Sequence, residues 1–163
     1  MFVLFKSQKE RVGFTLVELL ITIGIIGILA TVTVVSIGSA RAKARDAKRL
    51  SEVKAIQTAL TIYQNEKQYF PNSGGATLLL GTTQGSYGVL CDTDAGFQTN
   101  KDACKVYFME HVPGDPMSKP GSVYEYKYTD SPDYQTYTID FRLESDQGQL
   151  KAGDHKATPA GVQ

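Results

Sequence analysis

The chain has 163 residues, a formal net charge of zero and 42% hydrophobic residues, which suits one modest domain. Charge is unevenly distributed: residues 1–54 carry nine Lys and Arg against four Asp and Glu, and the remainder carries eight against thirteen. An acidic C-terminal part gives no electrostatic reason to expect nucleic acid as its main partner. The composition therefore argues against a protein whose head binds nucleic acid.

An apolar run with an acid at its start is the first feature along the chain. From Leu19 to Ile37, nineteen consecutive residues carry no charge, which is long enough for a helix that crosses a bilayer. Glu18 immediately precedes this run, and a carboxylate at the centre of a membrane costs roughly 2.5–3.5 kcal/mol on insertion scales. The run predicts a membrane-spanning helix, and Glu18 calls for a partner that neutralises it.

Three interpretations compete for residues 1–37. A cleaved secretory signal normally has an apolar core of roughly 7–15 residues, shorter than this run, and the small residues 38–40 form only a weak cleavage site. An ordinary anchor conflicts with the positive-inside rule, because the basic cluster at 41–49 would then place the rest of the chain in the cytoplasm. Neither interpretation explains Glu18.

The third interpretation rests on the segment KSQKERVGFTLVELLITIGIIGILA, which resembles the N-terminus of type IV pilins and pseudopilins. The resemblance consists of a short charged leader that ends in Gly13, then Phe14, then Glu18 four residues later, then the apolar run. It implies that a prepilin peptidase cuts between Gly13 and Phe14, and that the new terminus at Phe14 is N-methylated. It also implies a cytoplasmic leader and a head outside the cytoplasm, against the charge rule.

This resemblance supplies a partner for Glu18, which matches the family's characteristic glutamate. Cleavage would create an α-amine on Phe14, and in a helical stack of subunits this amine can face Glu18 of a neighbour. Two opposite charges about 4 Å apart attract by roughly 4 kcal/mol at an effective dielectric near 20. This attraction is comparable to the cost of placing the acid in the membrane, so Glu18 is expected to favour assembly over a lone subunit.

Helical periodicity continues beyond the apolar run. One stripe of apolar residues recurs at spacings of three and four, namely Leu50, Val53, Ile56, Leu60 and Tyr63. Pro71 followed by NSGG ends the pattern. We therefore expect a helix from Phe14 to about Tyr69, apolar all round in its first half and with one buried stripe in its second half.

Two features of the apolar run bear on its packing. The stretch 31–36 is β-branched except for Ser36, which lowers its intrinsic helix propensity. Whether the helix extends at 31–36 during assembly is a question that the sequence leaves open. Gly24 and Gly27 are better explained by close packing between helices.

After Pro71 the pattern changes to loops and strands. The segments TLLLG and SYGVL are short apolar pieces whose type stays open, and CKVYFME (104–110) is a candidate strand. VYEYKYT (123–129) and TYTIDFRLE (136–144) alternate apolar and polar residues, which predicts two strands with one buried face each. The Pro-bearing turn DSPD (130–133) joins them into an antiparallel pair. The tail KAGDHKATPAGVQ (151–163) has little pattern and is expected to be loose.

Together these elements predict an α+β fold: a long N-terminal helix, half transmembrane and half amphipathic, that carries a small C-terminal antiparallel sheet. This is also the type IV pilin-like shape that the resemblance implies. The expected divisions are a cleaved leader at 1–13, a transmembrane and assembly helix at 14–37, the amphipathic half of the helix at 38–70, and a globular head at 71–163.

Cys91 and Cys104 both follow the membrane-length segment. If that segment is an anchor with the head outside the cytoplasm, a disulfide between them can persist. The loop that it would close is short and polar, and closure of such a loop stabilises by about 3 kcal/mol in the chain-entropy model. The alternative is a pair of free buried thiols.

Other candidate chemistry in the sequence is weak. His111 and His155 are far apart in sequence, and each is better explained as a solvated or structural residue. Asp92 and Asp94 have calcium-loop spacing, but the required glycine and closing glutamate of such a loop are missing. No metal, cofactor or enzymatic activity is expected.

The basic run 41–49 could bind anionic lipid head groups, or form a polar stretch that lines subunit contacts, which we favour.

A second resemblance concerns the head. The segment VPGDPMSKPGSVYEY (112–126) resembles a loop of the major pseudopilins of type II secretion, a Pro-x-Asp-Pro pattern followed by Tyr-x-Tyr. The matching residues are Pro113, Asp115, Pro116, Tyr124 and Tyr126. The Asp- and Gly-rich calcium-binding end of those pseudopilins is not recognisable in ESDQGQLKAGDH (144–155). This departure favours a pilin-like relative over a secretion pseudopilin.

The resemblance implies a structural subunit that is stored in the inner membrane and polymerises with copies of itself into an extracellular type IV pilus-like filament. Its implied partners are the prepilin peptidase, a cytoplasmic ATPase, a membrane platform and, before assembly, membrane lipid. A pseudopilin of type II secretion or DNA uptake, in a short periplasmic pseudopilus, is the alternative. A monomeric membrane-anchored binding domain is an alternative of another class, although an anchor needs neither Glu18 nor the Gly13–Phe14 pair. Adhesion, motility, uptake and secretion depend on partners and stay open.

Overall fold

The computed structural model describes residues 13–81, 87–119 and 121–163. The chain divides into two compact units, Met1–Ala40 and Arg41–Gln163, and each is treated by itself. One helix, α1 (Leu16–Lys67), contributes residues to both units. Of the expected leader, residues 1–12 lie outside the described residues.

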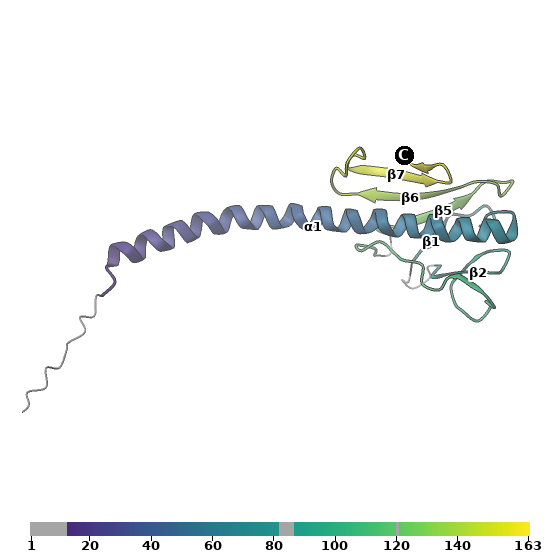
Figure 1. Ribbon diagram of the computed structural model, residues 1–163, viewed down its shortest axis with the longest axis horizontal. Helices are drawn as coiled ribbons and strands as arrows, with labels where there is room; N and C mark the ends of the chain where they lie inside the picture. Colours follow the sequence, from purple (N-terminus) through teal and green to yellow (C-terminus); the bar gives the residue numbers. More distant parts are fainter. Residues whose placement is uncertain (1–12, 82–86, 120) are drawn as a thin grey trace, which may run out of the picture. The chain divides into compact units, whose positions relative to one another are not determined.

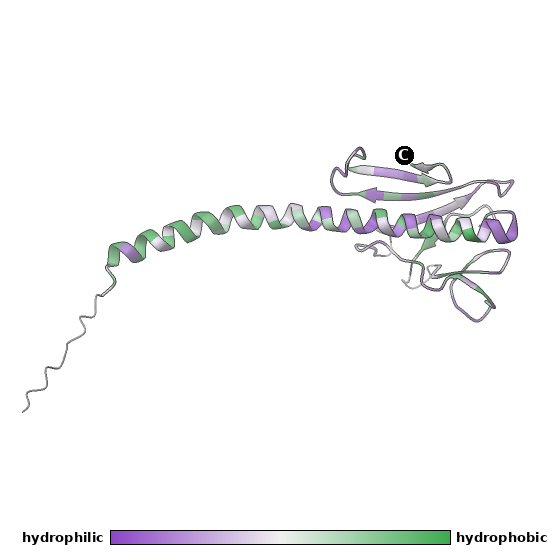
Figure 2. Ribbon diagram, viewed as in Figure 1, coloured by the Kyte–Doolittle hydropathy of each residue, from purple (hydrophilic) through white to green (hydrophobic). Residues whose placement is uncertain are grey.

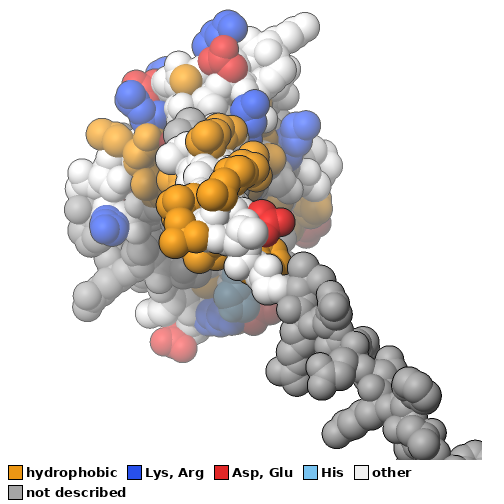
Figure 3. All heavy atoms as spheres, turned by 90° about the vertical axis from the view of Figure 1, so that its left-hand side faces the viewer, with side chains coloured by type: hydrophobic (Ala, Val, Ile, Leu, Met, Phe, Trp, Pro, Cys, Tyr) orange, Lys and Arg blue, Asp and Glu red, His pale blue; other side chains and the backbone are white. Residues whose placement is uncertain are grey.

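The part of α1 in the first unit is mostly apolar (Figure 2). The large apolar side chains described between Phe14 and Ile37 are 44% to 81% exposed, and Figure 3 shows hydrophobic side chains gathered over this end of the helix. By length and composition α1 can cross a membrane. The stretch 31–36 is helical, and the hydroxyls of Thr31 and Thr33 donate to the carbonyls of Ile28 (2.7 Å) and Leu29 (2.8 Å).

Helix α1 ends two residues before the expected position, at Lys67. Gln68 follows with a φ of 69°, in the left-handed region, and its N–H still donates to the carbonyl of Gln64 at 2.7 Å. A residue in this conformation commonly stops a helix. The chain therefore turns back toward the head before it reaches Pro71.

The head contains two antiparallel sheets (Figure 1). The five-stranded sheet has the order β1 (Leu78–Leu80), β5 (Tyr126–Asp130), β6 (Tyr137–Leu143), β7 (Gly153–Thr158), β8 (Gly161–Val162). The three-stranded sheet has the order β3 (Phe97–Gln98), β2 (Val89–Cys91), β4 (Tyr107–Met109). The predicted α+β fold, a long N-terminal helix with an antiparallel head, is confirmed.

The predicted hairpin is present, with one shifted boundary. Strand β6 alternates buried and half-buried residues along its whole length, as expected, and Tyr128 pairs with Ile139 across the hairpin. Strand β5 begins at Tyr126 and not at Val123. The N–H of Tyr124 donates to Ser122 Oγ at 3.0 Å, so this part of the predicted strand belongs to a turn.

The expectation of a loose tail was wrong. Residues 153–158 form β7, which pairs with β6 from Ile139–Ala157 to Leu143–Gly153, and β8 then pairs with β7. Only Ala157 is fully buried in β7, so the inward positions carry no run of large apolar side chains. The pairing with β6 stabilises a strand whose own sequence has little alternation.

The core of the head lies between the second half of α1 and the sheets. The predicted stripe is buried except at Leu50, which is half-buried: Val53, Ile56 and Leu60 are each 0% exposed. They form one cluster with the inward residues of both sheets. The hydroxyls of the buried tyrosines form hydrogen bonds; that of Tyr126, for example, donates to Glu52 Oε2 at 2.8 Å. The helix stripe therefore organises both sheets around it.

The three-stranded sheet holds a loop that is closed by a Cys91–Cys104 disulfide. Tyr63 of α1 donates its hydroxyl to the carbonyl of Thr93 in this loop at 2.8 Å. Gly96 has a φ of 65°, and a Cβ at this position would lie 2.6 Å from Pro71 Cβ. The loop is thus clipped covalently and also packed closely against the end of the helix.

The helix stripe provides a test of the core. We expect Ile56→Ala to lower the free energy of unfolding by about 2–5 kcal/mol, because it leaves a cavity in a fully buried site. Ile62→Ala is the matched control: Ile62 lies on the same helix but is 51% exposed, so its effect should stay within about 0.5 kcal/mol. Urea unfolding of the detergent-solubilised chain, followed by tyrosine circular dichroism, measures both. Equal effects of the two substitutions would contradict the assignment of the core.

The disulfide provides a second test. We expect Cys104→Ala to lower the free energy of unfolding by about 3 kcal/mol, because the loop of the unfolded chain is no longer closed. Ala103→Ser, an exposed change in the same loop, should have little effect. A reducing agent should bring the wild type to the level of the Cys104→Ala variant. Recovery of both cysteines as free thiols in non-reducing peptide mapping of the exported protein would contradict the pairing.

Candidate functional site

Helix α1 begins with a capping box formed by Thr15 and Glu18. The N–H and hydroxyl of Thr15 donate to Glu18 Oε2 at 3.1 Å and 2.9 Å. In return, the N–H of Glu18 donates to Thr15 Oγ1 at 3.2 Å. This reciprocal arrangement satisfies backbone groups that a helix start otherwise leaves unpaired. The pattern Thr-x-x-Glu before an apolar run is a sequence signal for such a cap, and the expectations drawn from the sequence did not include it.

The structure places the other expected site residues of this region next to the cap. Gly13 and Phe14 precede the helix, and the Phe14 side chain is 81% exposed. Within the chain, the Glu18 carboxylate is therefore held by Thr15. The expected partner of Glu18, the Phe14 amine of another cut subunit, stays a prediction.

The basic run 41–49 is divided between surface and interior, a division that the sequence pattern did not indicate. Arg41 and Lys43 are exposed, whereas Arg49 is among the largest fully buried side chains of the protein. Asp46, one turn earlier on the helix, is also 0% exposed. Only part of the run is thus available to line contacts with lipid or other subunits.

Arg49 is the centre of an ionic network with three carboxylates. Its Nε and Nη2 donate to Asp115 at 2.5 Å and 3.1 Å, and its Nη1 donates to Asp46 and Glu144 at 2.6 Å each. The guanidinium also lies 4.8 Å from the centre of the Tyr124 ring. One side chain thereby links the helix to the loop after β4 and to the end of β6.

The remaining acceptors of the network are also occupied. Asp46 accepts the N–H of Glu144 at 3.0 Å and both the N–H and hydroxyl of Ser145 at 2.8 Å and 2.7 Å. Arg45 forms a two-pronged contact with Glu144, at 2.8 Å and 2.5 Å. Within the described part of the chain, every buried side-chain nitrogen and oxygen has a hydrogen-bond partner. We call the residues Arg45, Asp46, Arg49, Asp115 and Glu144 the Arg49 network.

The protonation states in the network follow from these bonds. The hydrogen bond from Arg45, assisted by that from Arg49, lowers the pKa of Glu144 to about 2. Burial alone would raise the pKa of Asp46, but the bonds from Glu144, Ser145 and Arg49 outweigh burial and lower it. Burial likewise opposes the charge of Arg49, and its three carboxylate partners raise its pKa in spite of it. Glu144, Asp46 and Arg49 are therefore ionised at neutral pH.

The weaker candidates have ordinary structural roles. Asp92 accepts the N–H groups of Lys105 and Val106 at 3.0 Å and 3.1 Å, and Asp94 accepts the Tyr69 hydroxyl at 3.0 Å. His155 lies with its ring nitrogens 2.7 Å from the Lys151 carbonyl and 3.1 Å from that of Gln163. The described residues contain no group of three or more His, Cys, Asp or Glu that could hold a metal ion.

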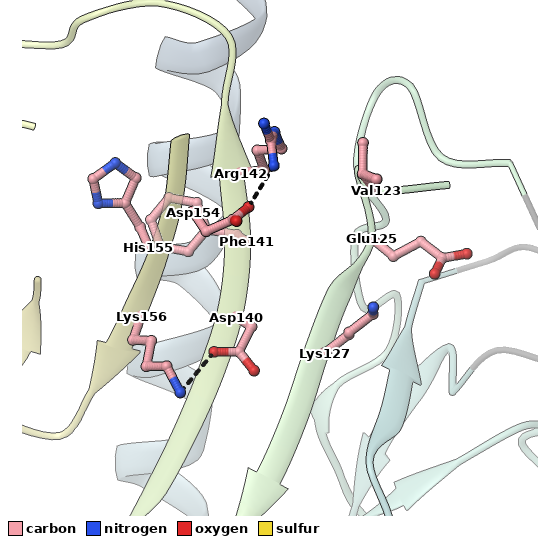
Figure 4. A pocket seen from close by; sticks show the side chains of 9 residues that line it. All are labelled: Val123, Glu125, Lys127, Asp140, Phe141, Arg142, Asp154, His155 and Lys156. Carbon is pink, nitrogen blue, oxygen red and sulfur yellow. Dashed lines mark hydrogen bonds and ion pairs between the residues drawn. The ribbon is translucent and has the colours of Figure 1, made fainter. Parts of the chain in front are cut away.

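A hollow of about 450 Å³ lies over the five-stranded sheet (Figure 4). Charged side chains of β6 and β7 line it in cross-strand pairs: Arg142 contacts Asp154 at 3.0 Å, and Lys156 contacts Asp140 at 3.5 Å. Opposite charges facing one another across a sheet stabilise it modestly. The charges of these two strands that line the hollow are thus already matched within the sheet.

Comparison with known proteins finds relatives among secretion components. Type II secretion system core protein G of Escherichia coli K12 is 34% identical over 67 residues, which are 41% of this chain and 46% of that protein. The protein of the same name from Pseudomonas aeruginosa is 27% identical over 114 residues, 70% of this chain and 73% of that protein. The Vibrio cholerae protein of that name is 29% identical over 68 residues, 42% and 47% of the two chains.

Two of these three alignments cover less than half of the relative's length. The alignment with the Escherichia coli protein spans just under half of that protein's length, at 46%. No family model matches the chain, and no solved structure matches it significantly. This likeness confirms the resemblance that the Gly13–Phe14–Glu18 motif and the apolar run predicted. The sequence likeness and the long N-terminal apolar helix both point to relatives among the type IV pilin-like proteins, the family that includes the pseudopilins.

Proposed function

We propose that this chain is a structural subunit that is held in a membrane by the first half of α1 and polymerises through that half into a pilus-like filament. The observation that carries the proposal is the apolar surface from Phe14 to Ile37, where the large side chains described are 44% to 81% exposed. Such a surface has to be covered by lipid or by other apolar helices. A helical polymer of identical chains covers it with copies of the same surface.

The charge of Glu18 favours assembly of this polymer inside a membrane. In the lone chain the carboxylate bonds to Thr15 but keeps its charge. A cut after Gly13 would place the Phe14 amine one helical turn away from it in sequence, within reach of a neighbouring subunit. The attraction of roughly 4 kcal/mol at about 4 Å and an effective dielectric near 20 then favours the assembled state.

A second candidate within the same class is a pseudopilin of type II secretion. The observation that favours it is the shared name of the relatives, type II secretion system core protein G. The filament would then be a short periplasmic pseudopilus, and not a long pilus outside the cell. In both cases the partners would be copies of the chain, a prepilin peptidase, an assembly platform and an ATPase. Imaging of cells for filaments that contain this chain distinguishes the two by length and location.

Processing provides the first test. We expect the mature chain to begin at Phe14, because the leader ends in Gly13 and Glu18 follows at the family's spacing. Intact-mass measurement of protein from membranes or filaments should show the loss of thirteen residues, with or without one added methyl group. A mature chain that starts after Ala40, or an uncut chain inside the filament, would contradict the proposal.

The charge of Glu18 provides the second test. We expect Glu18→Leu to give normal amounts of cleaved, membrane-held protein and few or no filaments, because each subunit contact loses an ion pair and leaves an amine unpaired. Glu18→Gln separates the charge from the cap, because glutamine at this position can still complete a capping box. We expect it to fail in assembly as well, as measured by the amount of filament sheared from cells and by electron microscopy.

The outcomes of this test are distinct. Wild-type levels of filament from Glu18→Gln together with few from Glu18→Leu would show that the cap matters and the charge does not. Wild-type levels from Glu18→Leu would show that neither does. A wild-type chain that stays monomeric in the membrane, although its host assembles filaments, would favour a membrane-anchored binding domain.

A further inference from the structure

We propose that Arg49 is a positioning residue for polymerisation: the Arg49 network fixes the helical turn 45–49 against the head, so that every subunit presents its head in the same way. This inference rests on the proposed function and adds to it a role for a buried charge. All members of the network belong to the unit Arg41–Gln163.

The network joins segments that are remote in sequence. Arg49 reaches Asp115, 66 positions later, and Glu144, 95 positions later, while Asp46 on the same helix accepts the N–H groups of Glu144 and Ser145. The helix, the loop after β4 and the end of β6 therefore meet at one guanidinium. The backbone that follows β6 is therefore bound to the helix through the short, buried side chain of Asp46.

The hydrogen bonds of the Arg49 network depend on direction, whereas the packing contacts of the apolar stripe do not. The stripe from Val53 to Tyr63 excludes water, and apolar packing tolerates changes of shape when volume is kept. A planar guanidinium that donates to three carboxylates fixes both distance and angle. The hydroxyls of Tyr63 and Tyr126 add single hydrogen bonds between helix and head. The network binds one helical turn to two separate segments of the head, and it therefore contributes most to fixing the rotation and axial position of the helix.

The energetics support a role in specificity. The side chains of Arg49, Asp46 and Asp115 are 0% exposed, so three charges have lost their water. Buried ion pairs are often no more stabilising than apolar residues of the same volume, and their best-attested use is to select one arrangement among several. The location agrees with this use, because residues 45–49 are among the first turns of the unit Arg41–Gln163, close in sequence to the apolar segment that would polymerise.

Equivalent subunits in a helical polymer need one fixed relation between the polymerising segment and the head. A head that can rotate about its helix would meet its neighbours in a different way at each position. Loss of the network should therefore reduce assembly beyond any loss of head stability. A merely structural role predicts instead that assembly follows head stability alone.

The test uses the full chain in cells that assemble the wild type. Arg49→Met removes the central charge and leaves Asp46 and Asp115 without their cationic partner, whereas Glu144 keeps Arg45. The double variant Arg49→Met/Asp115→Asn removes one charge of each sign, so the net charge of the network is unchanged. The asparagine side chain of this variant keeps an oxygen that can accept the Met117 N–H, as Asp115 Oδ1 does at 2.7 Å. Ile56→Ala lowers head stability without touching a charge and is the control.

Three quantities are measured for each variant: the amount of sheared filament, the fraction with the Cys91–Cys104 disulfide, and the urea midpoint of the detergent-solubilised chain. We expect the double variant to keep the disulfide and to give at least tenfold fewer filaments than Ile56→Ala, at a urea midpoint equal to or above that of this control. Arg49→Lys, which keeps the charge but not the planar fork, should also give fewer filaments than this control.

Contrary outcomes separate the two proposals. Filaments at the wild-type level from the double variant would overturn the positioning role and leave the proposed function intact. A filament loss in Ile56→Ala as large as that in the double variant would also overturn it, because assembly would then follow stability alone. Absence of filaments from the wild-type chain would overturn the proposed function, and the positioning role with it.

Discussion

Burial of one stripe of helix α1 is the contact on which the head depends. Val53, Ile56 and Leu60 are fully buried and belong to the same cluster as the inward residues of both sheets. Within the described residues, neither sheet has a second helix to cover its apolar face. The helix α1 therefore acts as the common layer, as a two-layer domain requires. Helix α1 provides this layer as a single element, because its second half buries one apolar stripe against the sheets while its first half stays apolar.

The two kinds of contact between helix and head divide the work. The apolar stripe supplies the area removed from water, which is the dominant favourable contribution to folding. The Arg49 network supplies directional bonds from one guanidinium to three carboxylates. The first favours a compact head, and the second selects one arrangement of it. A polymer of identical subunits needs both, because a stable head in a variable position would not repeat.

Glu18 combines a local role with a proposed role between subunits. Its carboxylate completes the capping box with Thr15, which explains an acid at this helix start even in a single chain. The cap leaves the charge in place, and one charge inside a membrane remains costly. The same residue can thus start the helix in the stored subunit and attract a neighbour in the filament. Substitution by leucine removes both roles, and substitution by glutamine removes only the charge.

The sequence by itself determined those elements whose signal is local. The stripe from Leu50 to Tyr63 and the alternation in β6 repeat with the period of their own secondary structure, and the apolar run has the length of a membrane span, so helix, strand and membrane length could be predicted. The Gly13–Phe14–Glu18 spacing pointed to the family in the same way. The Thr15–Glu18 cap was also local and readable, although it was missed.

Only the tertiary structure decided the elements that depend on partners far along the chain. Strand β7 is formed by pairing with β6, since its own small and polar residues carry little alternation. In the sequence, Arg49 and Asp46 belong to a charged run that is typical of an exposed helix face. They are buried because Asp115 and Glu144, which lie 66 and 95 positions after Arg49, pack against them in the fold. A buried charge is tolerated only where its partners converge, and that convergence is a property of the fold and not of any local pattern.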